Sequence, residues 1–224
     1  MAATVRGLNG VRNRTAGVGI MPAMSDAEAP APRPMIRGEK VWLRPSEPSD
    51  IIHDSTYAGD AEVGHFLGAK TPMSKAGAER FSAEIFSQSP MDPNGYGYAI
   101  CLLGSEESIG TVFLRNVDKV NGSGIVGIFI GDRRYLGQGY GTDALNALVD
   151  LGFGELRLER IELEVFDFNE RAVRSYEKAG FQTDAIQRRA RFHRGAHHDV
   201  HIMSILREDW LAMPRKRSWE LAGP

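Results

Sequence analysis

The sequence predicts a single domain of mixed α/β or α+β class, built around a mixed β-sheet. Two observations support this class. Between residues 41 and 206 the apolar periodicity alternates between strand and helix types, in the order β-α-α-β-β-β-α-β-α-β-β. The 224 residues are 42% apolar and 25% charged, values typical of globular proteins, and a chain of this length can bury a core without disulfides.

The first half of the pattern contains four strands and two helices. The expected strands are residues 41–45, 96–103, 109–117 and 125–130, and the expected helices are residues 48–67 and 74–88. Pro45 ends the first strand, because proline has no N–H to give to a sheet. The dipeptide Asn121-Gly122 is a tight-turn signal. The apolar run that follows it is typical of a buried central strand.

The second half alternates helix and strand before two closing strands. The expected helices are residues 139–153 and 170–179, and the expected strands are residues 161–165, 181–194 and 199–206. In the first helix, small and apolar residues recur at helical spacing and form one stripe: Gly141, Ala144, Leu145, Leu148, Leu151 and Gly152. Gly180 stands where a left-handed helix cap belongs.

The two ends of the chain are predicted to lie outside the domain, which we place at residues 35–210. Residues 1–34 show no sustained period and end in a proline-rich run, so we expect a flexible extension. A transit peptide, or a true start at Met21, Met24 or Met35, is an open alternative. Residues 211–224 are expected to be a short C-terminal tail with a basic stretch at 214–217.

Composition excludes several functional classes. The chain has 27 basic and 29 acidic side chains, a net charge of −2, so nothing indicates nucleic-acid binding. Its single cysteine, Cys101, cannot form an intrachain disulfide and suits the reducing cytoplasm. No apolar run reaches the ~18–20 residues that cross a bilayer. We therefore expect a cytoplasmic protein without nucleic-acid or membrane partners.

A glycine-rich turn, residues 134–142 (RYLGQGYGT), lies between the apolar strand and the striped helix. Alternate glycines allow successive N–H groups to point inward, and the helix that follows adds its positive dipole end, so the turn suits a pyrophosphate. A tight turn selected only for its geometry is an equally simple interpretation. A Walker A loop is excluded by the missing lysine, and a dinucleotide fingerprint by Thr142 in place of its third glycine.

A second motif begins the following helix. Asn169 is a good N-cap, and residues 169, 172, 173 and 176 share one helix face. Tyr176 therefore lies on the same face as the cap. Such a tyrosine often only packs that face, with its hydroxyl at the rim.

Both motifs resemble the GNAT superfamily of N-acetyltransferases. Residues 134–139 match its coenzyme A pyrophosphate loop, R-x-x-G-x-G, and residues 169–181 match its pattern N-x-x-A-x-x-x-Y-x-x-x-G-F. The resemblance covers residues 35–210. Arg44-Pro45, Asp60-Ala61-Glu62-Val63 and His198-Asp199-Val200 are similar to the branch that includes ribosomal-protein alanine and polyamine acetyltransferases. It implies a GNAT-like fold, with a mostly antiparallel mixed sheet of about seven strands flanked by helices.

The resemblance also implies a site and a mechanism. Acetyl-CoA would be the co-substrate, the acceptor would be a primary amine, and Tyr176 would be the general acid that protonates the leaving thiolate. A main-chain N–H near residues 129–131 would hold the thioester carbonyl. The implied cofactor contacts are Phe129, Ile130, Gly131, Arg134, Leu136, Gly137, Gln138, Gly139, Tyr140, Gly141, Thr142, Asn169, Glu170 and Arg171. His198 and Asp199 are candidate acceptor contacts.

Several points stay open at this stage. The general base is not identified, because Glu162 and Glu164 are better interpreted as a solvated strand face. The histidines near residues 197–201 are a poor zinc site, since strand spacing turns neighbouring side chains apart, so we expect no metal. Cys101 is expected to pack in its strand.

The acceptor class also stays open among a polyamine-like amine, an antibiotic amine and a protein N-terminus. The protein could form a homodimer. A CoA-binding regulatory module without turnover is the main alternative function. A flavin or nicotinamide enzyme is disfavoured by Thr142.

Overall fold

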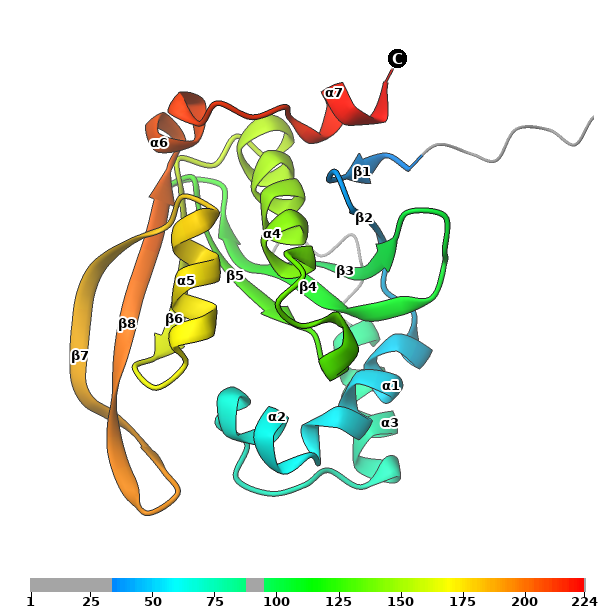
Figure 1. Cartoon of the computed structure of the whole chain (residues 1–224), viewed down its shortest axis with the longest axis vertical. Helices are drawn as coiled ribbons and strands as arrows, with labels where there is room; N and C mark the ends of the chain where they lie inside the picture. The colour runs from blue at the N-terminus through cyan, green and yellow to red at the C-terminus, as the bar shows by residue number, and fades with distance from the viewer. Residues whose placement is uncertain (1–33, 88–94, 224) are drawn as a thin grey trace, which may run out of the picture. The chain divides into compact units, whose positions relative to one another are not determined.

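A computed structural model of the chain describes residues 34–87 and 95–223. The expectation of a flexible extension at residues 1–34 falls almost entirely outside this range and stays a prediction. Within it, the strands form a single sheet in the order β1-β2-β3-β4-β5-β6-β8-β7 (Figure 1). No helix of the described part is long and apolar enough to span a membrane.

The sheet is mixed but mostly antiparallel, as the sequence predicts. Its strands are β1 (Ile36–Arg37), β2 (Val41–Pro45), β3 (Gly95–Leu102), β4 (Ser108–Asp118), β5 (Ser123–Phe129), β6 (Arg160–Phe166), β7 (Gln182–His193) and β8 (Ala196–Leu206). Strands β1 to β5 follow one another as antiparallel neighbours. Strand β6 joins β5 in parallel, and β8 and β7 continue antiparallel beyond it. The sheet therefore has one strand more than expected, because the two-residue β1 is too short to show a period.

The helices depart from the prediction in two respects: the first expected helix is divided in two, and two short helices near the C-terminus were not expected. They are α1 (Pro48–Ala58), α2 (Ala61–Leu67), α3 (Lys75–Ser87), α4 (Tyr140–Asp150), α5 (Glu170–Lys178), α6 (Arg207–Ala212) and α7 (Ser218–Ala222). A 3₁₀ turn, η1 (Arg133–Tyr135), precedes α4, and a π turn, η2 (Leu151–Glu155), follows it. The single helix expected over residues 48–67 is wrong. Asp60 is extended and its carboxylate accepts the amides of Glu62 and Val63, so it ends one helix and caps the next.

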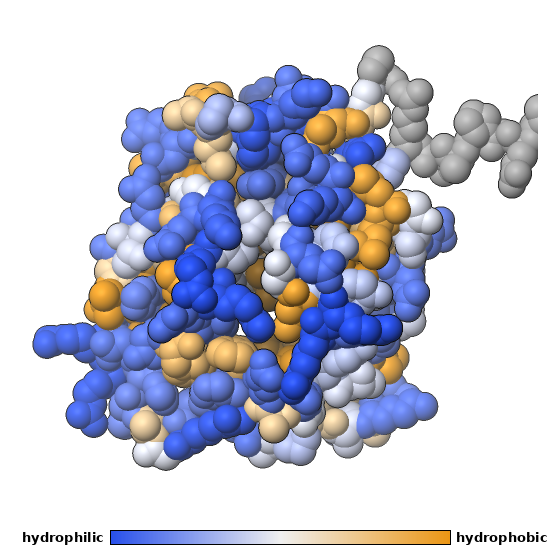
Figure 2. Space-filling model, viewed as in Figure 1, coloured by the Kyte–Doolittle hydropathy of each residue, from blue (hydrophilic) through white to orange (hydrophobic). Residues whose placement is uncertain are grey.

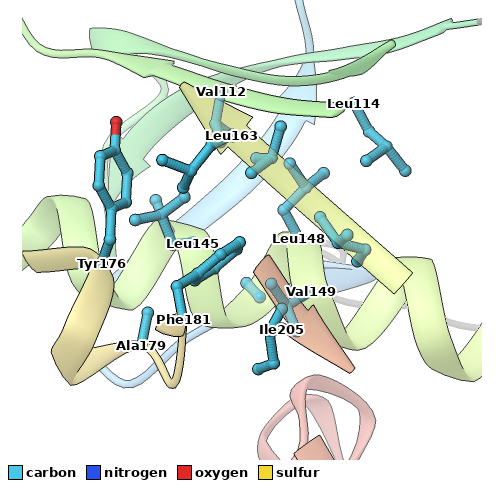
Figure 3. Close-up of a cluster of buried hydrophobic side chains, with 14 of the residues drawn as sticks. Val112, Leu114, Leu145, Leu148, Val149, Leu163, Tyr176, Ala179, Phe181 and Ile205 are labelled. Atoms are coloured by element: carbon cyan, nitrogen blue, oxygen red, sulfur yellow. The ribbon is translucent and has the colours of Figure 1, made fainter. Parts of the chain in front are cut away.

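Helix α4 carries the main core. Ala144, Leu145, Leu148 and Gly152 of its predicted stripe are buried, and Gly141 and Leu151 are partly buried. Leu145 and Leu148 pack with Leu114 of β4, Leu163 of β6 and other strand residues (Figure 3). Helix α5 lies beside α4 on this face (Figure 1). Helices α1 to α3 pack with one another (Figure 1). Helix α1 lies against the opposite face of β4, where Asp54 hydrogen-bonds Thr111.

Cys101 is completely buried in β3, as predicted, and burial raises the pKa of its thiol. The C-terminal residues, in contrast, do not trail away from the domain. The carboxylate of Asp150, at the end of α4, accepts both arms of Arg215 at 2.8 and 2.7 Å, the Trp210 indole at 2.7 Å and the Ser218 amide at 2.7 Å. Arg215, from the basic stretch at 214–217, is thus the partner of the buried Asp150. The positive charge of the stretch did not by itself predict this contact.

Candidate functional site

A cavity of about 1000 Å³ opens where β5 and β6 part. The two strands pair in parallel only from Ser123–Arg160 to Ile125–Glu162. Beyond that register both strands continue, and residues 126–130 of the first and 163–166 of the second line the cavity instead. Figure 2 shows a hollow near the middle of the molecular face, apolar in its depth and bordered by hydrophilic side chains.

The cavity draws its wall from both faces of the sheet. Ile128 and Ile130 point toward the start of α4, within 3.7 Å of the place where a Gly141 Cβ would stand. Gly127, which directly precedes Ile128, faces the other way, under the ring of Phe113, which a Cβ there would strike. The cavity therefore connects a chamber on the α4 side with a chamber on the opposite face, and we call these the helix-side and far-side chambers.

The glycine-rich turn forms one end of the helix-side chamber. Gly137 and Gly139 have φ of +74° and +84°, a left-handed conformation that glycine adopts without strain. Gly139 is the N-cap of α4, and the space next to Gly137 is open. Lys40 donates from Nζ to the Gln138 carbonyl at 2.9 Å, which places a cation beside the turn. Free helix amides, open space and a nearby ammonium together suit an anion.

The cavity wall includes many of the predicted cofactor contacts. These are Phe129, Ile130, Leu136, Gly137, Gly139, Tyr140, Gly141, Thr142, Asn169 and Arg171. The wall does not include Gly131, Arg134, Gln138 or Glu170.

The side chains outside the wall have other partners. Arg134 pairs with Asp132 at 2.6 Å, and Glu170 pairs with Arg174 at 3.1 Å. Gly131 is covered by the Tyr57 ring of α1 at a distance that leaves no room for a Cβ. The roles of these residues in cofactor binding stay predictions.

Helix α5 delivers Asn169 and Tyr176 to the same wall. Asn169 caps the helix through Oδ1, which accepts the Ala172 amide at 3.2 Å, as the sequence predicts. The Gly180 cap is also confirmed, with φ of +93°. Figure 3 shows the Tyr176 ring standing away from α5, with its hydroxyl on the side remote from Ala179 and Phe181.

Burial sets the acid strength of Tyr176. The side chain is 8% exposed, and desolvation raises its pKa to about 12. The phenol is thus protonated throughout the physiological range. It can donate a proton, but it is not present as a phenolate in the resting protein.

His198 and Asp199, the candidate acceptor contacts, do not line the cavity. Asp199 accepts the Arg189 amide at 2.7 Å and closes a bulge in β7. His198 lies 3.6 Å from a carboxylate oxygen of Asp167 and edge-on to Phe168. Their role in acceptor binding stays a prediction.

Sequence reasoning missed most of the far-side chamber. Glu162 and Glu164 line it, and their side chains are 38% and 53% exposed, in agreement with the expected solvated strand face. Each is matched with an arginine: Arg160 at 3.4 Å and Arg191 at 3.0 Å. The alternation of β6 marked these carboxylates as facing away from the core. The alternation could not show that β5 diverges from β6 beside these carboxylates. Strand divergence depends on how two separate segments pair, and the sequence of one strand does not show this.

No cluster of three or more His, Cys, Asp or Glu side chains within the described residues could hold a metal ion.

Comparison with known proteins gives a consistent family. The family model of the acetyltransferase (GNAT) domain matches residues 40–182. An uncharacterized N-acetyltransferase, p20, of Bacillus licheniformis is 26% identical over 172 residues, covering 77% of this chain and 96% of that protein. A Bacillus subtilis protein provisionally named a ribosomal N-acetyltransferase, YdaF, is 31% identical over 175 residues, covering 77% of this chain and 94% of that protein.

A solved structure shares the fold. Spermidine N-acetyltransferase from Vibrio cholerae, in complex with CoA and spermine, superposes with a TM-score of 0.67 over 76% of this chain and 98% of that one, at 23% identity. With the family match covering more than half of its length, the chain belongs to the GNAT family and is an N-acetyltransferase.

Proposed function

We propose that this protein transfers the acetyl group of acetyl-CoA directly to a primary amine, with Tyr176 as general acid. The observation that carries the proposal is the cavity that passes from one face of the sheet to the other between β5 and β6. Two substrates can enter it from opposite faces and meet at the parted strands. Tyr176 is one of the residues that line this cavity, which supports its proposed role.

The helix-side chamber fits acetyl-CoA. The turn around Gly137 and Gly139 and the first amides of α4 suit the pyrophosphate. The edge of β5 that has left β6 offers main-chain N–H and C=O groups, to which the amide-containing pantetheine arm can pair as an added strand. Asn169 stands beside that arm. The CoA bound in the Vibrio cholerae structure is a property of that protein, so the assignment for this chain is supported by the fit of these groups.

The chemistry follows from the two chambers. The amine nitrogen attacks the thioester carbon, and the carbonyl oxygen becomes an oxyanion held by a main-chain N–H near residues 129–131. The carbon–sulfur bond then breaks, Tyr176 gives its proton to the sulfur, and the nitrogen loses a proton to solvent or a carboxylate. Because a primary amine has a pKa near 10.4, about one molecule in 10³ is neutral at pH 7 and ready to attack.

The acceptor class is an amine that is cationic before it reacts. Glu162 and Glu164 place carboxylates in the far-side chamber, where an ammonium group can approach. A polyamine-like amine or a protein N-terminus fits this chemistry, and relatives named for spermidine, ribosomal and aminoglycoside N-acetyltransferases span that range. A relative's acceptor does not by itself assign the acceptor of this chain.

The test combines binding and turnover. In a thermal-shift comparison of acetyl-CoA, NAD, FAD and ATP, acetyl-CoA alone is expected to raise Tm, because a ligand that binds only the folded state stabilises it. Thiol release from acetyl-CoA is then followed with spermidine, kanamycin and an N-terminal alanine peptide. Stabilisation by acetyl-CoA without thiol release for any amine would favour the regulatory module. Stabilisation by NAD or FAD instead would overturn the proposal.

A further inference from the structure

Helix α2 forms part of the cavity wall through Glu62, Val63, Phe66 and Leu67. It contains only seven residues, and helices this short do not persist in water without tertiary contacts. The groups that hold α2 in place therefore determine whether the far-side chamber has this wall.

A pair of histidines joins α2 to the far end of the β7–β8 hairpin. Nδ1 of His65 lies 2.9 Å from Nε2 of His193, and the two rings are stacked with their centroids 5.1 Å apart. Phe168, from the loop between β6 and α5, stacks on His65 at 4.4 Å and 11°, and its ring centroid lies 5.9 Å from that of His193. His193 is 5% exposed and His65 is half-buried, so this is a partly buried contact between three elements that meet at the lower part of Figure 1.

Other contacts secure α2 at its two ends. At the start, Arg133 of η1 pairs with Asp60 and Glu62 at 3.1 and 3.0 Å, and Arg194 donates to the Ala61 carbonyl. At the end, Gly68 presses on the Phe166 ring so closely that a Cβ would lie 2.7 Å from it. The histidine pair lies between these points, in the middle of the helix.

The two histidines can form their hydrogen bond in only some protonation states. One ring must donate N–H while the other accepts with a bare nitrogen, so two imidazolium rings cannot make the bond and repel each other. The groups around the pair are mainly cationic. His198 and Arg194 approach from the hairpin, and Arg171 from α5 lies 5.2 Å over the neighbouring Phe66 ring.

The nearby acids are already engaged. Asp167 from the β6–α5 loop is beside His198 at 3.6 Å, and Glu62 on α2 itself pairs with Arg133. The pKa of His65 is accordingly lowered, first by burial and then by Arg194, His193 and His198.

We propose that His65 and His193 are positioning residues that fasten α2 as the wall of the far-side chamber, and that protonation of both rings in acidic solution releases it. The link to acceptor binding rests on the proposed function, whereas the fastening itself does not. The helix-side chamber has its own supports, so release is expected to raise KM for the amine and to leave acetyl-CoA binding unchanged.

The first test needs no substrate. Amide hydrogen exchange of the peptide that covers α2 is measured on the full chain at pH 7.5 and 4.5, corrected for the intrinsic pH dependence of exchange. We expect α2 to lose about tenfold protection at pH 4.5, the effect of one lost hydrogen bond, while peptides from α4 keep theirs. Equal protection of α2 at both pH values would overturn the proposal, whatever the activity.

Three variants separate the bond from the charge. The double variant H65N/H193Q keeps a donor and an acceptor at the same two ring positions without titrating, so α2 should stay protected at both pH values. H193L fills the buried site but breaks the bond, so α2 should exchange quickly at both. H53Q, at an exposed histidine of α1 outside the pair, should behave as wild type. Acid-induced loss in the double variant would overturn the proposal.

The second test is kinetic, with spermidine as the probe amine, or kanamycin or the alanine peptide if spermidine is not acetylated. H193L is expected to raise the amine KM severalfold at pH 7.5, with KM for acetyl-CoA unchanged and with rescue in H65N/H193Q. A loss confined to kcat would overturn the positioning role. Absence of turnover with every amine in wild type would count against the proposed function and leave the exchange result standing.

Discussion

At the scale of single residues, Tyr176 carries the mechanism and yields the first prediction. Tyr176→Phe keeps the ring in the core but removes the only proton that it could give. We expect unchanged acetyl-CoA affinity by calorimetry and a fall in kcat of roughly 10²–10⁴-fold, the usual contribution of a positioned acid. Tyr96→Phe on β3, away from the cavity, is the control. A variant that keeps more than about a third of kcat, with chemistry rate-limiting, would show that another group protonates the sulfur.

A second residue, Asp54 on α1, predicts a pH dependence of stability. Desolvation raises its pKa to about 7, and Oδ2 has no hydrogen-bond partner among the described residues. An acid whose pKa is higher in the folded state holds more protons there, so stability falls as pH rises from about 4 to 7.

Asp54→Asn removes this loss. Three pKa units correspond to about 4 kcal/mol at most, so at pH 8 we expect the variant to gain on the order of 2 kcal/mol over wild type, and much less at pH 5. Urea unfolding at the two pH values measures it, with Glu79→Gln, an exposed acid of α3, as control. A gain of equal size at both pH values would assign the effect to packing.

At the scale of elements, the turn that begins α4 yields a prediction with a matched control. Gly139 and Gly104 have the same φ of +84°, so an aspartate costs the same backbone strain at either position. Only Gly139→Asp places a negative side chain at the start of α4, next to Lys40. We expect it to abolish acetyl-CoA binding in calorimetry, whereas Gly104→Asp binds normally. Wild-type affinity in a folded Gly139→Asp protein would remove the pyrophosphate from this turn.

The elements also show which parts of the fold a sequence can predict. Helix α4 and strands β5 and β6 were predicted within a few residues, because their periods extend over several turns or pairs and their apolar faces are buried. The break at Asp60 was missed because the apolar period continues across it, and the carboxylate that caps α2 looks like any exposed acid. The glycine turn and Asn169 were visible because their chemistry is local.

Residues that depend on pairing between distant segments were not visible. Glu162 and Glu164 line a chamber only because β5 turns away from β6, and His65 meets His193 across 128 positions of sequence. Asp143 is another example. Its carboxylate accepts the amides of Glu39, Lys40 and Val41, which fastens the start of β2 to α4.

At the scale of the whole molecule, the two ends of the chain give opposite predictions. Deleting residues 214–224 leaves the buried Asp150 carboxylate without Arg215 and the Ser218 amide. Breaking a buried pair by removing one partner costs about 3–5 kcal/mol, so we expect Tm to fall by roughly 8 °C or more. A change of under 2 °C would show that the contact contributes little.

Deleting residues 1–34, which lack an apolar period, is expected to leave Tm and acetyl-CoA binding nearly unchanged. Differential scanning calorimetry measures the Tm of both truncated proteins. A loss of several degrees would mean that this segment packs on the domain or on a second copy.

The parting of β5 from β6 also has a mechanical meaning. Strands β1 to β5 and strands β6 to β8 are two plates that share a seam of three residue pairs, with α4 and α5 bridging it from one side. Such a seam is the natural place for the molecule to flex. A substrate arm that pairs along the free edge of β5 would extend the pairing across this seam. The protein would therefore be most rigid while the co-substrate is bound and most flexible just after the product dissociates.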